Sequence, residues 1–290
     1  MSNKQKGLLS ILMLSILSGS TAAVIKIGLV SIPPLSFAFL RFLIAGIIIL
    51  PFLLREGKIK SIWSLVPLSL LGTVNIILFN TGLKTTTATI AQLLYAGVPL
   101  ITVLILFFFF KERLAFRKVI GITLGFLGVT LVVLLPIFEK GTRFSGDLLG
   151  NLLIIIGVIS WSFYAVFSKD KLKSFSPFTM TAAFTWVTLL TLLPLSIFES
   201  IQYFNWWKTL SLSSVFSLVY VGTVSTIFTY LLNQYAIKHG GSIFASMQFY
   251  LIPVSAYLFA FVLLGEKLTT GLIIGGVLAL LGVYITTKRK

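Results

Sequence analysis

Two stretches of this chain decide its fold: PLITVLILFFFFKERLAFRKVIGITLGFLGV at 99–129 and PVSAYLFAFVLLGEKLTTGLIIGGVLALLGV at 253–283. Each begins with a proline inside an apolar run, crosses a short charged segment and enters a second apolar run that carries glycines. The two stretches lie 154 residues apart and share residues at corresponding positions. The sequence therefore contains an internal repeat. The coinciding pairs are Pro99 and Pro253, Glu112 and Glu266, Leu114 and Leu268, Gly121 and Gly275, Gly128 and Gly282, and Val129 and Val283.

The repeat extends toward the beginning of each half at slightly different offsets. Residues 72–74 match residues 222–224 as Gly-Thr-Val, which is an offset of 150. Four residues of the first apolar run, at 18–24, match residues 160–166 at an offset of 142. We expect loops of different length to cause these changes of offset. The repeat predicts two halves, 1–138 and 146–290.

The composition places these halves in a membrane. Hydrophobic residues make up 57% of the chain and charged residues 10%, with a mean hydropathy of +1.05, whereas a soluble domain carries about 25% charged residues. A membrane-spanning helix needs about 20 mostly apolar residues. This rule predicts ten spans, near 8–30, 35–54, 63–83, 87–110, 117–136, 148–168, 177–198, 212–235, 242–264 and 270–287.

Five spans per half is an odd number, so the second half enters the membrane from the other side. The sequence thus predicts an all-α membrane protein of ten transmembrane helices, arranged as two inverted five-helix repeats around a central cavity. Inverted repeats of this kind are typical of secondary transporters, in which exchange of conformation between the halves gives alternating access to a site near the midplane.

The net charge of +16 reflects how the chain is oriented in the membrane and does not indicate a nucleic-acid partner. Lys and Arg lie in short segments between spans, and those on one side outnumber those on the other by about three to one. This bias predicts that the N- and C-termini are cytoplasmic and that the protein lies in the cell membrane. Residues 4–22 also resemble a cleaved signal peptide, but cleavage would remove a span that the repeat requires.

Several kinds of chemistry lack the residues they need. The chain has no cysteine and one histidine, so we expect neither a metal site nor a disulfide. No glycine-rich stretch ends in the Gly-Lys-Ser/Thr of a phosphate-binding loop, so we expect no ATP hydrolysis. The spans offer no cluster of acids or histidines and no nucleophile with its base, which argues against a membrane enzyme. We expect no cofactor.

A set of short motifs connects the chain to a known family. The motifs are Gly19, Lys26, Leu40-Arg41-Phe42, and Glu112-Arg113-Leu114 recurring as Glu266-Lys267-Leu268. With these the chain resembles the EamA-type drug/metabolite transporters over nearly its whole length. The resemblance implies a ten-helix bundle whose cavity is lined by spans 1, 3, 4, 6, 8 and 9, and export of amino acids or related metabolites. One departure is Ser18-Gly19, where the family often has Trp-Gly; the repeat places Trp161 in the equivalent region.

Polar and aromatic residues within the spans are the candidates for binding a substrate. Some share a helix face because they are three or four residues apart, and rings and amides together suit a small amphiphile. The alternative is that the amides only bond neighbouring helices, which is common in membrane bundles. The candidates are Asn75 and Phe79; Gln92 and Tyr95, with their repeat equivalents Ser246 and Phe249; Trp161 and Tyr164; and Tyr230.

Two cations complete the candidate site. Lys26 and Arg41 lie within spans, whereas all seven acids lie in or beside predicted loops. The two cations could attract a carboxylate or phosphate, or Lys26 could extend its ammonium to the interface and Arg41 could bond helix-end carbonyls. In either case an anionic or zwitterionic substrate fits better than a lipophilic cation, which would need a buried acid.

The sequence therefore predicts a secondary transporter, an exporter of amino acids or similar small zwitterionic or anionic metabolites. A carrier of a nucleotide-sugar or a lipid headgroup is the alternative. The expected partners are the bilayer and a small-molecule substrate. The spaced glycines of spans five and ten predict close helix packing, either within the chain or between two copies in a homodimer.

Overall fold

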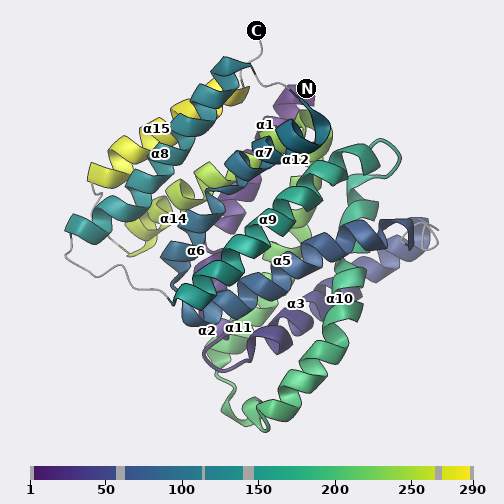
Figure 1. Ribbon diagram of the computed structural model, residues 1–290. Helices are drawn as coiled ribbons and strands as arrows, with labels where there is room; N and C mark the ends of the chain where they lie inside the picture. The colour runs from purple at the N-terminus through teal and green to yellow at the C-terminus, as the bar shows by residue number, and fades with distance from the viewer. Residues whose placement is uncertain (1–2, 57–62, 113–114, 140–146, 265–269, 288–290) are drawn as a thin grey trace.

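The computed structural model describes residues 3–56, 63–112, 115–139, 147–264 and 270–287, and within these ranges it is helical, with no strand (Figure 1). The first half contains α1 (Asn3–Ser18), α2 (Thr21–Gly28), α3 (Pro34–Glu56), the short 3-10 turn η1 (Trp63–Leu65), α5 (Val66–Thr85), α6 (Ala88–Tyr95), α7 (Val98–Phe110) and α8 (Phe116–Glu139).

The second half repeats this order with a more divided eighth span. It contains α9 (Leu148–Lys171), α10 (Pro177–Gln202), the 3-10 turn η2 (Trp206–Thr209), α11 (Leu212–Tyr220), the π-helix η3 (Val221–Phe228), α12 (Thr229–Gly240), α13 (Ser242–Ser246), α14 (Gln248–Leu264) and α15 (Thr270–Thr287).

Every predicted span falls on one helix or on consecutive helices. Among the described residues, seven helical stretches are long and apolar enough to cross a membrane. The other three predicted spans correspond to α8, to α13 with α14, and to α15. The protein is therefore an all-α membrane protein of ten spans, as the sequence predicts.

Three spans are each divided into two helices. The first divides between α1 and α2, the fourth between α6 and α7, and the ninth between α13 and α14. In the fourth span the break lies at Gly97, just before Pro99, whose ring nitrogen cannot donate to the carbonyl of Tyr95. Pro253, inside α14, deprives the carbonyl of Phe249 of its donor in the same way.

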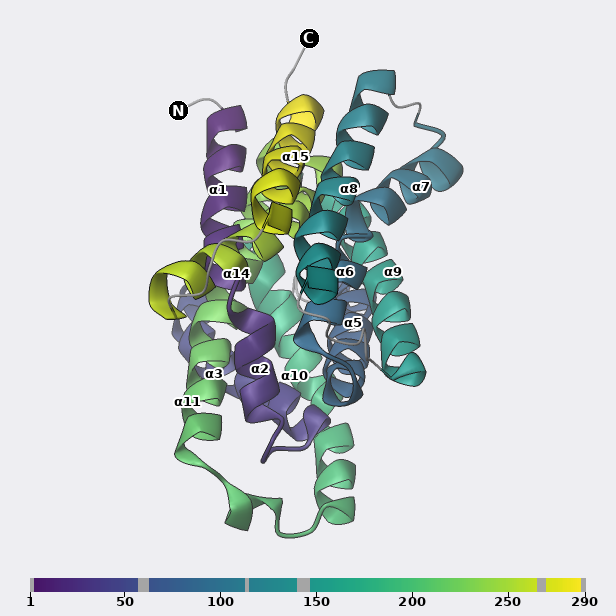
Figure 2. The same cartoon turned by 90° about the vertical axis from the view of Figure 1, so that its left-hand side faces the viewer.

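The equivalent helices of the two halves lie antiparallel, which shows that the repeat is inverted. Along α3 and α10, Ser36 contacts Glu199 near one end, the rings of Phe42 and Phe184 meet in the middle at 5.6 Å, and Phe52 approaches Phe178 near the other end. The residue numbers rise along one helix as they fall along the other. The same arrangement holds for α8 and α15, which pack side by side (Figure 2).

The other helix contacts follow the same pseudo-twofold relation. The contact of α1 with α12 corresponds to that of α9 with α5, and the contact of α7 with α9 corresponds to that of α14 with α1. Both termini lie at one end of the bundle, which we call the terminal end, and α11 reaches toward the opposite end (Figures 1 and 2).

The residues that raise the offset between the two halves from 150 to 154 do not lie in a loop, contrary to our expectation. Two residues separate α5 from α6, and one residue separates α12 from α13, so the added residues lie inside the eighth span. There the backbone forms η3, in which the Thr226 hydroxyl donates to the carbonyl of Val221 five residues earlier. A π-helix accommodates extra residues because its turns are wider.

The spaced glycines are packed within the chain. A Cβ built on Gly282 would lie 2.4 Å from the backbone nitrogen of Gly125, and one on Gly128 would lie 2.4 Å from the nitrogen of Ala279. The backbones of α8 and α15 are thus in direct contact. This contact uses the glycine faces inside one molecule, and leaves them unavailable for the homodimer that we considered.

We predict that Gly282→Ala lowers the thermal stability of the purified protein by several degrees, because the methyl group must push α8 away from α15. Gly276→Ala on the same helix is the matched control: its nearest neighbour would lie 3.8 Å away, so it should be neutral or slightly stabilising. Thermal unfolding in detergent measures both. Equal melting temperatures for the two variants would contradict this account of the glycines.

Candidate functional site

A cavity of about 150 Å³ lies at the centre of the bundle, between the two repeats. It receives side chains from α1, α2, α3, α5 and α6 of the first half and from α9, η3, α12 and α14 of the second. All six spans that the family resemblance implies contribute, and span two adds one residue, Arg41. The lining residues are Leu14, Ser18, Thr21, Ala22, Ile25, Arg41, Asn75, Ile76, Phe79, Ala91, Gln92, Tyr95, Trp161, Ser225, Thr229, Tyr230, Asn233, Gln248, Phe249, Ile252 and Pro253.

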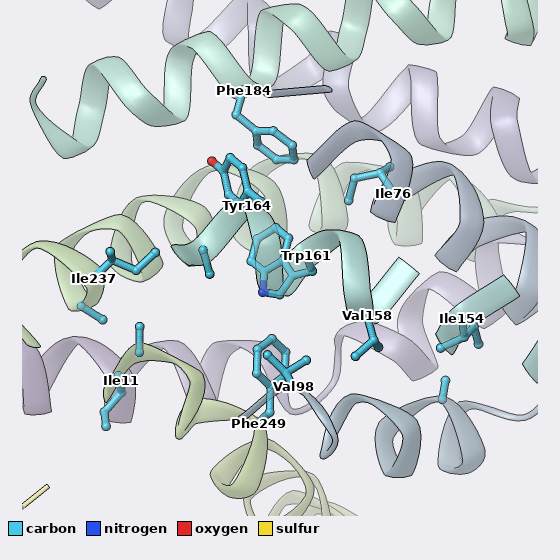
Figure 3. Close-up of a cluster of buried hydrophobic side chains, with 14 of the residues drawn as sticks. Ile11, Ile76, Val98, Ile154, Val158, Trp161, Tyr164, Phe184, Ile237 and Phe249 are labelled. Carbon is cyan, nitrogen blue, oxygen red and sulfur yellow. The ribbon is translucent and has the colours of Figure 1, made fainter. Parts of the chain in front are cut away.

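The cavity is sealed toward the terminal end. Ile11 of α1, Val98 of α7, Ile237 of α12 and Met247 between α13 and α14 are almost completely buried there, and the first three are labelled in Figure 3. The cavity-lining residues of the first span begin beyond this layer, at Leu14, and continue into α2. The cavity therefore extends from the middle of the bundle toward the opposite end.

Aromatic rings form much of the wall. The Trp161 ring lies 5.1 Å from the Tyr164 ring and 5.9 Å from the Tyr230 ring, measured between centroids. Figure 3 shows Trp161 in the middle of the cluster, with Tyr164 and Phe184 on one side. On another wall the Tyr95 ring lies 5.3 Å from Phe79 and 5.4 Å from Phe249. A small molecule in the cavity would contact these ring surfaces.

Buried amides bond helices together and set the direction of the remaining polar groups. Asn75 Nδ2 donates to the Tyr95 hydroxyl at 2.5 Å and to the Gly157 carbonyl at 2.8 Å, which joins α5, α6 and α9. Gln248 Nε2 donates to Asn233 Oδ1 at 2.7 Å, which joins α14 and α12. Since the Tyr95 hydroxyl already accepts a bond, its own proton is free to be donated.

Arg41 supplies the positive charge of the cavity. Its side chain is 2% exposed, and its guanidinium lies 5.0 Å from the centroid of the Phe42 ring and interacts with the Tyr230 hydroxyl. Among the described residues that line the cavity, Arg41 Nε and Asn233 Nδ2 are buried donors without a protein partner. No acidic residue lines the cavity. An unpaired donor is costly in such a place, so this cavity favours an acceptor-bearing ligand.

Eight of the eleven candidate residues line the cavity: Arg41, Asn75, Phe79, Gln92, Tyr95, Trp161, Tyr230 and Phe249. Arg41 lies only a few residues into its span, but its side chain is 2% exposed and lies in the cavity wall. Lys26, Tyr164 and Ser246 lie outside the cavity, and each bonds another part of the bundle.

Lys26 bonds helix-end carbonyls instead of facing the cavity. Its ammonium donates to the carbonyls of Leu83 and Thr86 at the end of α5, while Lys84 donates to the carbonyl of Leu29 just after α2, at 2.7 Å. Cations at helix C-termini satisfy free carbonyls and offset the helix dipole. The two lysines thus fasten these helix ends to each other.

Tyr164 and Ser246 face away from the cavity for different reasons. The Tyr164 hydroxyl lies behind Trp161 and accepts a bond from Gln234 Nε2 at 2.7 Å. Ser246 is the last residue of α13, and its hydroxyl donates to the carbonyl of Ile243 at 2.7 Å. The helix break that follows changes the direction of the next side chains, so Gln248 faces the cavity instead.

Gln248 and Asn233 line the cavity but are not among the candidates predicted from the sequence. Both are amides inside spans, which is a signal for function or for helix bonding. The repeat pointed to Ser246 as the counterpart of Gln92, and the break at Met247 is not evident from the sequence. Glu112, which follows the fourth span, has its carboxylate 3.8 Å from the ammonium of Lys169, with both side chains half exposed. Its repeat equivalent, Glu266, lies outside the described residues.

The fold and the cavity define a class: a polytopic membrane protein of inverted repeats with a substrate-sized cavity between them. The EamA-like transporter family matches residues 5–134 and 148–288, and the chain belongs to this family. It is therefore a transporter and not an enzyme.

Known relatives agree with this assignment. An uncharacterized transporter of Archaeoglobus fulgidus is 31% identical over 275 residues, which cover 92% of each chain. The uncharacterized transporter YoaV of Bacillus subtilis is 28% identical over 293 residues, or 97% of each chain. A solved crystal structure has the same fold, with a TM-score of 0.74 at 22% identity over 97% of this chain and 96% of the other.

The absence of cysteine from the sequence allows a direct test of which end of the cavity is closed. We predict that Ala22→Cys, in the cavity wall, reacts with a membrane-impermeant thiol reagent added from the side of the opposite end. Ala236→Cys, which is 0% exposed in the sealed half of α12, should react at least about tenfold more slowly from either side. Faster reaction of Ala22→Cys from the terminal side would contradict the sealed end.

Proposed function

We propose that this transporter exports amino acids or closely related small zwitterionic or anionic metabolites by alternating access through the central cavity. The observation that carries the proposal is the buried guanidinium of Arg41, which has an unpartnered Nε in a cavity without an acidic wall residue. A carboxylate is the acceptor that best matches a guanidinium, because charge-assisted bonds are roughly twice as strong as neutral ones.

Other groups of the cavity support a zwitterion in particular. The hydroxyl protons of Tyr95 and Tyr230 can join Arg41 and Asn233 as donors to a carboxylate. The carbonyls of Tyr95 and Phe249, freed by Pro99 and Pro253, are acceptors that an ammonium group requires. Both residues line the cavity, one from each repeat. The two halves thus offer donors and acceptors in one small volume.

The volume of the cavity supports a small substrate. An engineered protein cavity of about 150 Å³ holds benzene, and this cavity has about the same volume. A small amino acid is of comparable size. A nucleotide-sugar is several times larger and carries two phosphates, whereas Arg41 is the one cation among the described residues that line the cavity. These observations favour the small metabolite over the nucleotide-sugar alternative.

We further propose that both termini are cytoplasmic, on the basis of the distribution of Lys and Arg. In that orientation the sealed end faces the cytoplasm and the cavity faces outward in this conformation. An exporter in this state has released, or can release, its cargo to the outside. The inverted repeat supports the reciprocal state, in which the two halves exchange conformations.

Counterflow in proteoliposomes tests the substrate class. We predict that unlabelled neutral or acidic amino acids drive uptake of labelled ones, and that Arg41→Gln reduces this exchange at low substrate concentration by about tenfold or more, the loss of one charge-assisted bond. Arg55→Gln, at the exposed end of the same helix, is the matched control and should leave exchange unchanged. Exchange of a sugar-nucleotide in the absence of any amino-acid exchange would refute the proposal.

Side chains of the fourth span test the role of the cavity wall. We predict that Gln92→Ala and Tyr95→Phe both lower exchange while the purified amount and the melting temperature stay close to those of the parent protein. Gln92 is a polar wall residue, and the Tyr95 hydroxyl is a donor to the substrate in this proposal. If the variants lose folded protein in proportion to activity, the two residues serve helix packing instead.

A further inference from the structure

A buried carboxylate joins the two repeats at a place where the sequence suggests only the start of a loop. The predicted seventh span ends at residue 198, but α10 continues to Gln202 and carries Glu199 in its last turn, 6% exposed. Glu199 Oε1 accepts from the Leu35 nitrogen at 3.1 Å. Its Oε2 accepts from the Ser36 nitrogen at 2.7 Å and from the Ser36 hydroxyl at 2.9 Å.

These contacts form a helix cap supplied by another helix. Leu35 and Ser36 belong to the first turn of α3, where backbone N–H groups have no partner inside the helix and the helix dipole is positive. A carboxylate accepts hydrogen bonds from these N–H groups, and its negative charge interacts favourably with the helix dipole. The cap also links α3 of the first repeat to α10, its equivalent in the second. Without Glu199, the Leu35 and Ser36 nitrogens would lose their acceptor, and the Ser36 hydroxyl would keep only its contact with the Ser200 hydroxyl at 3.3 Å.

One side of this cap borders a second hollow, which opens to the surface. This hollow, of about 490 Å³, lies between α3 and α10 beside the cap, and its wall includes Ser36, Phe39 and Leu40 of α3. Ile197 and Ile201, also in its wall, are more than half exposed, so the hollow opens to the surface. Apolar contacts between helices gain little over contacts with lipid. The directional bonds of Glu199 therefore act together with the packing of Phe37 and Ala38, both 0% exposed, to fix this end of α3.

We propose that Glu199 is a positioning residue for Arg41. The same helix carries both the capped first turn and Arg41, which follows Ser36 by five residues, or about 7.5 Å along the axis. Arg41 is the one cavity-lining residue that α3 contributes. By fixing the end of α3, Glu199 holds the guanidinium at the depth of Tyr230 and Asn233. The inference rests on the proposed role of Arg41 as the anion-binding group.

The electrostatic potential inside the cavity tests this inference with known probes. The reporter is Ala22→Cys, which lines the cavity, and the probes are the anionic sulfonatoethyl and the cationic trimethylammonioethyl methanethiosulfonates. The ratio of their reaction rates measures the local charge. Arg41→Gln in this background should lower the ratio of anionic to cationic reaction by about tenfold.

Glu199→Gln should lower the same ratio by about threefold or more, and Glu199→Asp should restore part of it because it keeps the carboxylate. The direction in which the ratio changes distinguishes two explanations. Loss of a negative charge acting only through space would raise the ratio, since the cavity would become more attractive to the anion. A decrease therefore reports displacement of Arg41. Glu112→Gln, at a half-exposed acid outside the cavity, is the control and should leave the ratio unchanged.

Three results would show whether the anion-binding role of the cavity or the positioning role of Glu199 is wrong. An unchanged ratio in Arg41→Gln would overturn the proposed anion-binding role of the cavity. A decrease in Arg41→Gln with no decrease in Glu199→Gln would overturn the positioning role alone. A Glu199→Gln protein that melts earlier but keeps the parent ratio in its folded fraction would show that Glu199 serves only as a helix cap, which also overturns the inference.

Discussion

The polar backbone inside a membrane must be satisfied by the protein itself, and much of this structure follows from that constraint. Several helix ends inside the bundle are satisfied by charged side chains. Lys26 and Lys84 bond the carbonyls that end two neighbouring helices, and Glu199 accepts from the nitrogens that begin a third. Most of the charged groups at these ends are therefore structural. Arg41, which lies inside α3 and not at a helix end, differs from them because its Nε has no protein partner.

The inverted repeat places the cavity where neither half alone could build it. The first repeat supplies Arg41, Asn75 and Tyr95, and the second supplies Trp161, Tyr230 and Asn233. Because equivalent helices lie antiparallel, the halves meet at the centre with different residues at corresponding depths. Divergence of the two copies has therefore produced one asymmetric cavity, with a cation on one wall and a cluster of rings on another.

Much of this could be predicted from sequence, for physical reasons that also set the limit. Apolar length identified the ten spans, and an odd number per half implied inversion. Residue type located eight of the 21 residues that line the cavity, because amides and rings inside spans are candidates for contact with a substrate. The role of Glu199 could not be predicted, since its burial depends on α10 running one turn past its apolar residues. The orientation of Gln248 depends on a break at Met247 that no proline or glycine marks.

The direct contact of α8 with α15 constrains how this molecule can move. Their glycines bring backbone against backbone, and neither helix contributes a residue to the cavity wall. Backbones in contact have no side chains to repack, so these helices cannot slide past each other in small steps. We infer that the halves tilt about this pair during transport and that a passage for cargo opens on the side of the bundle away from it.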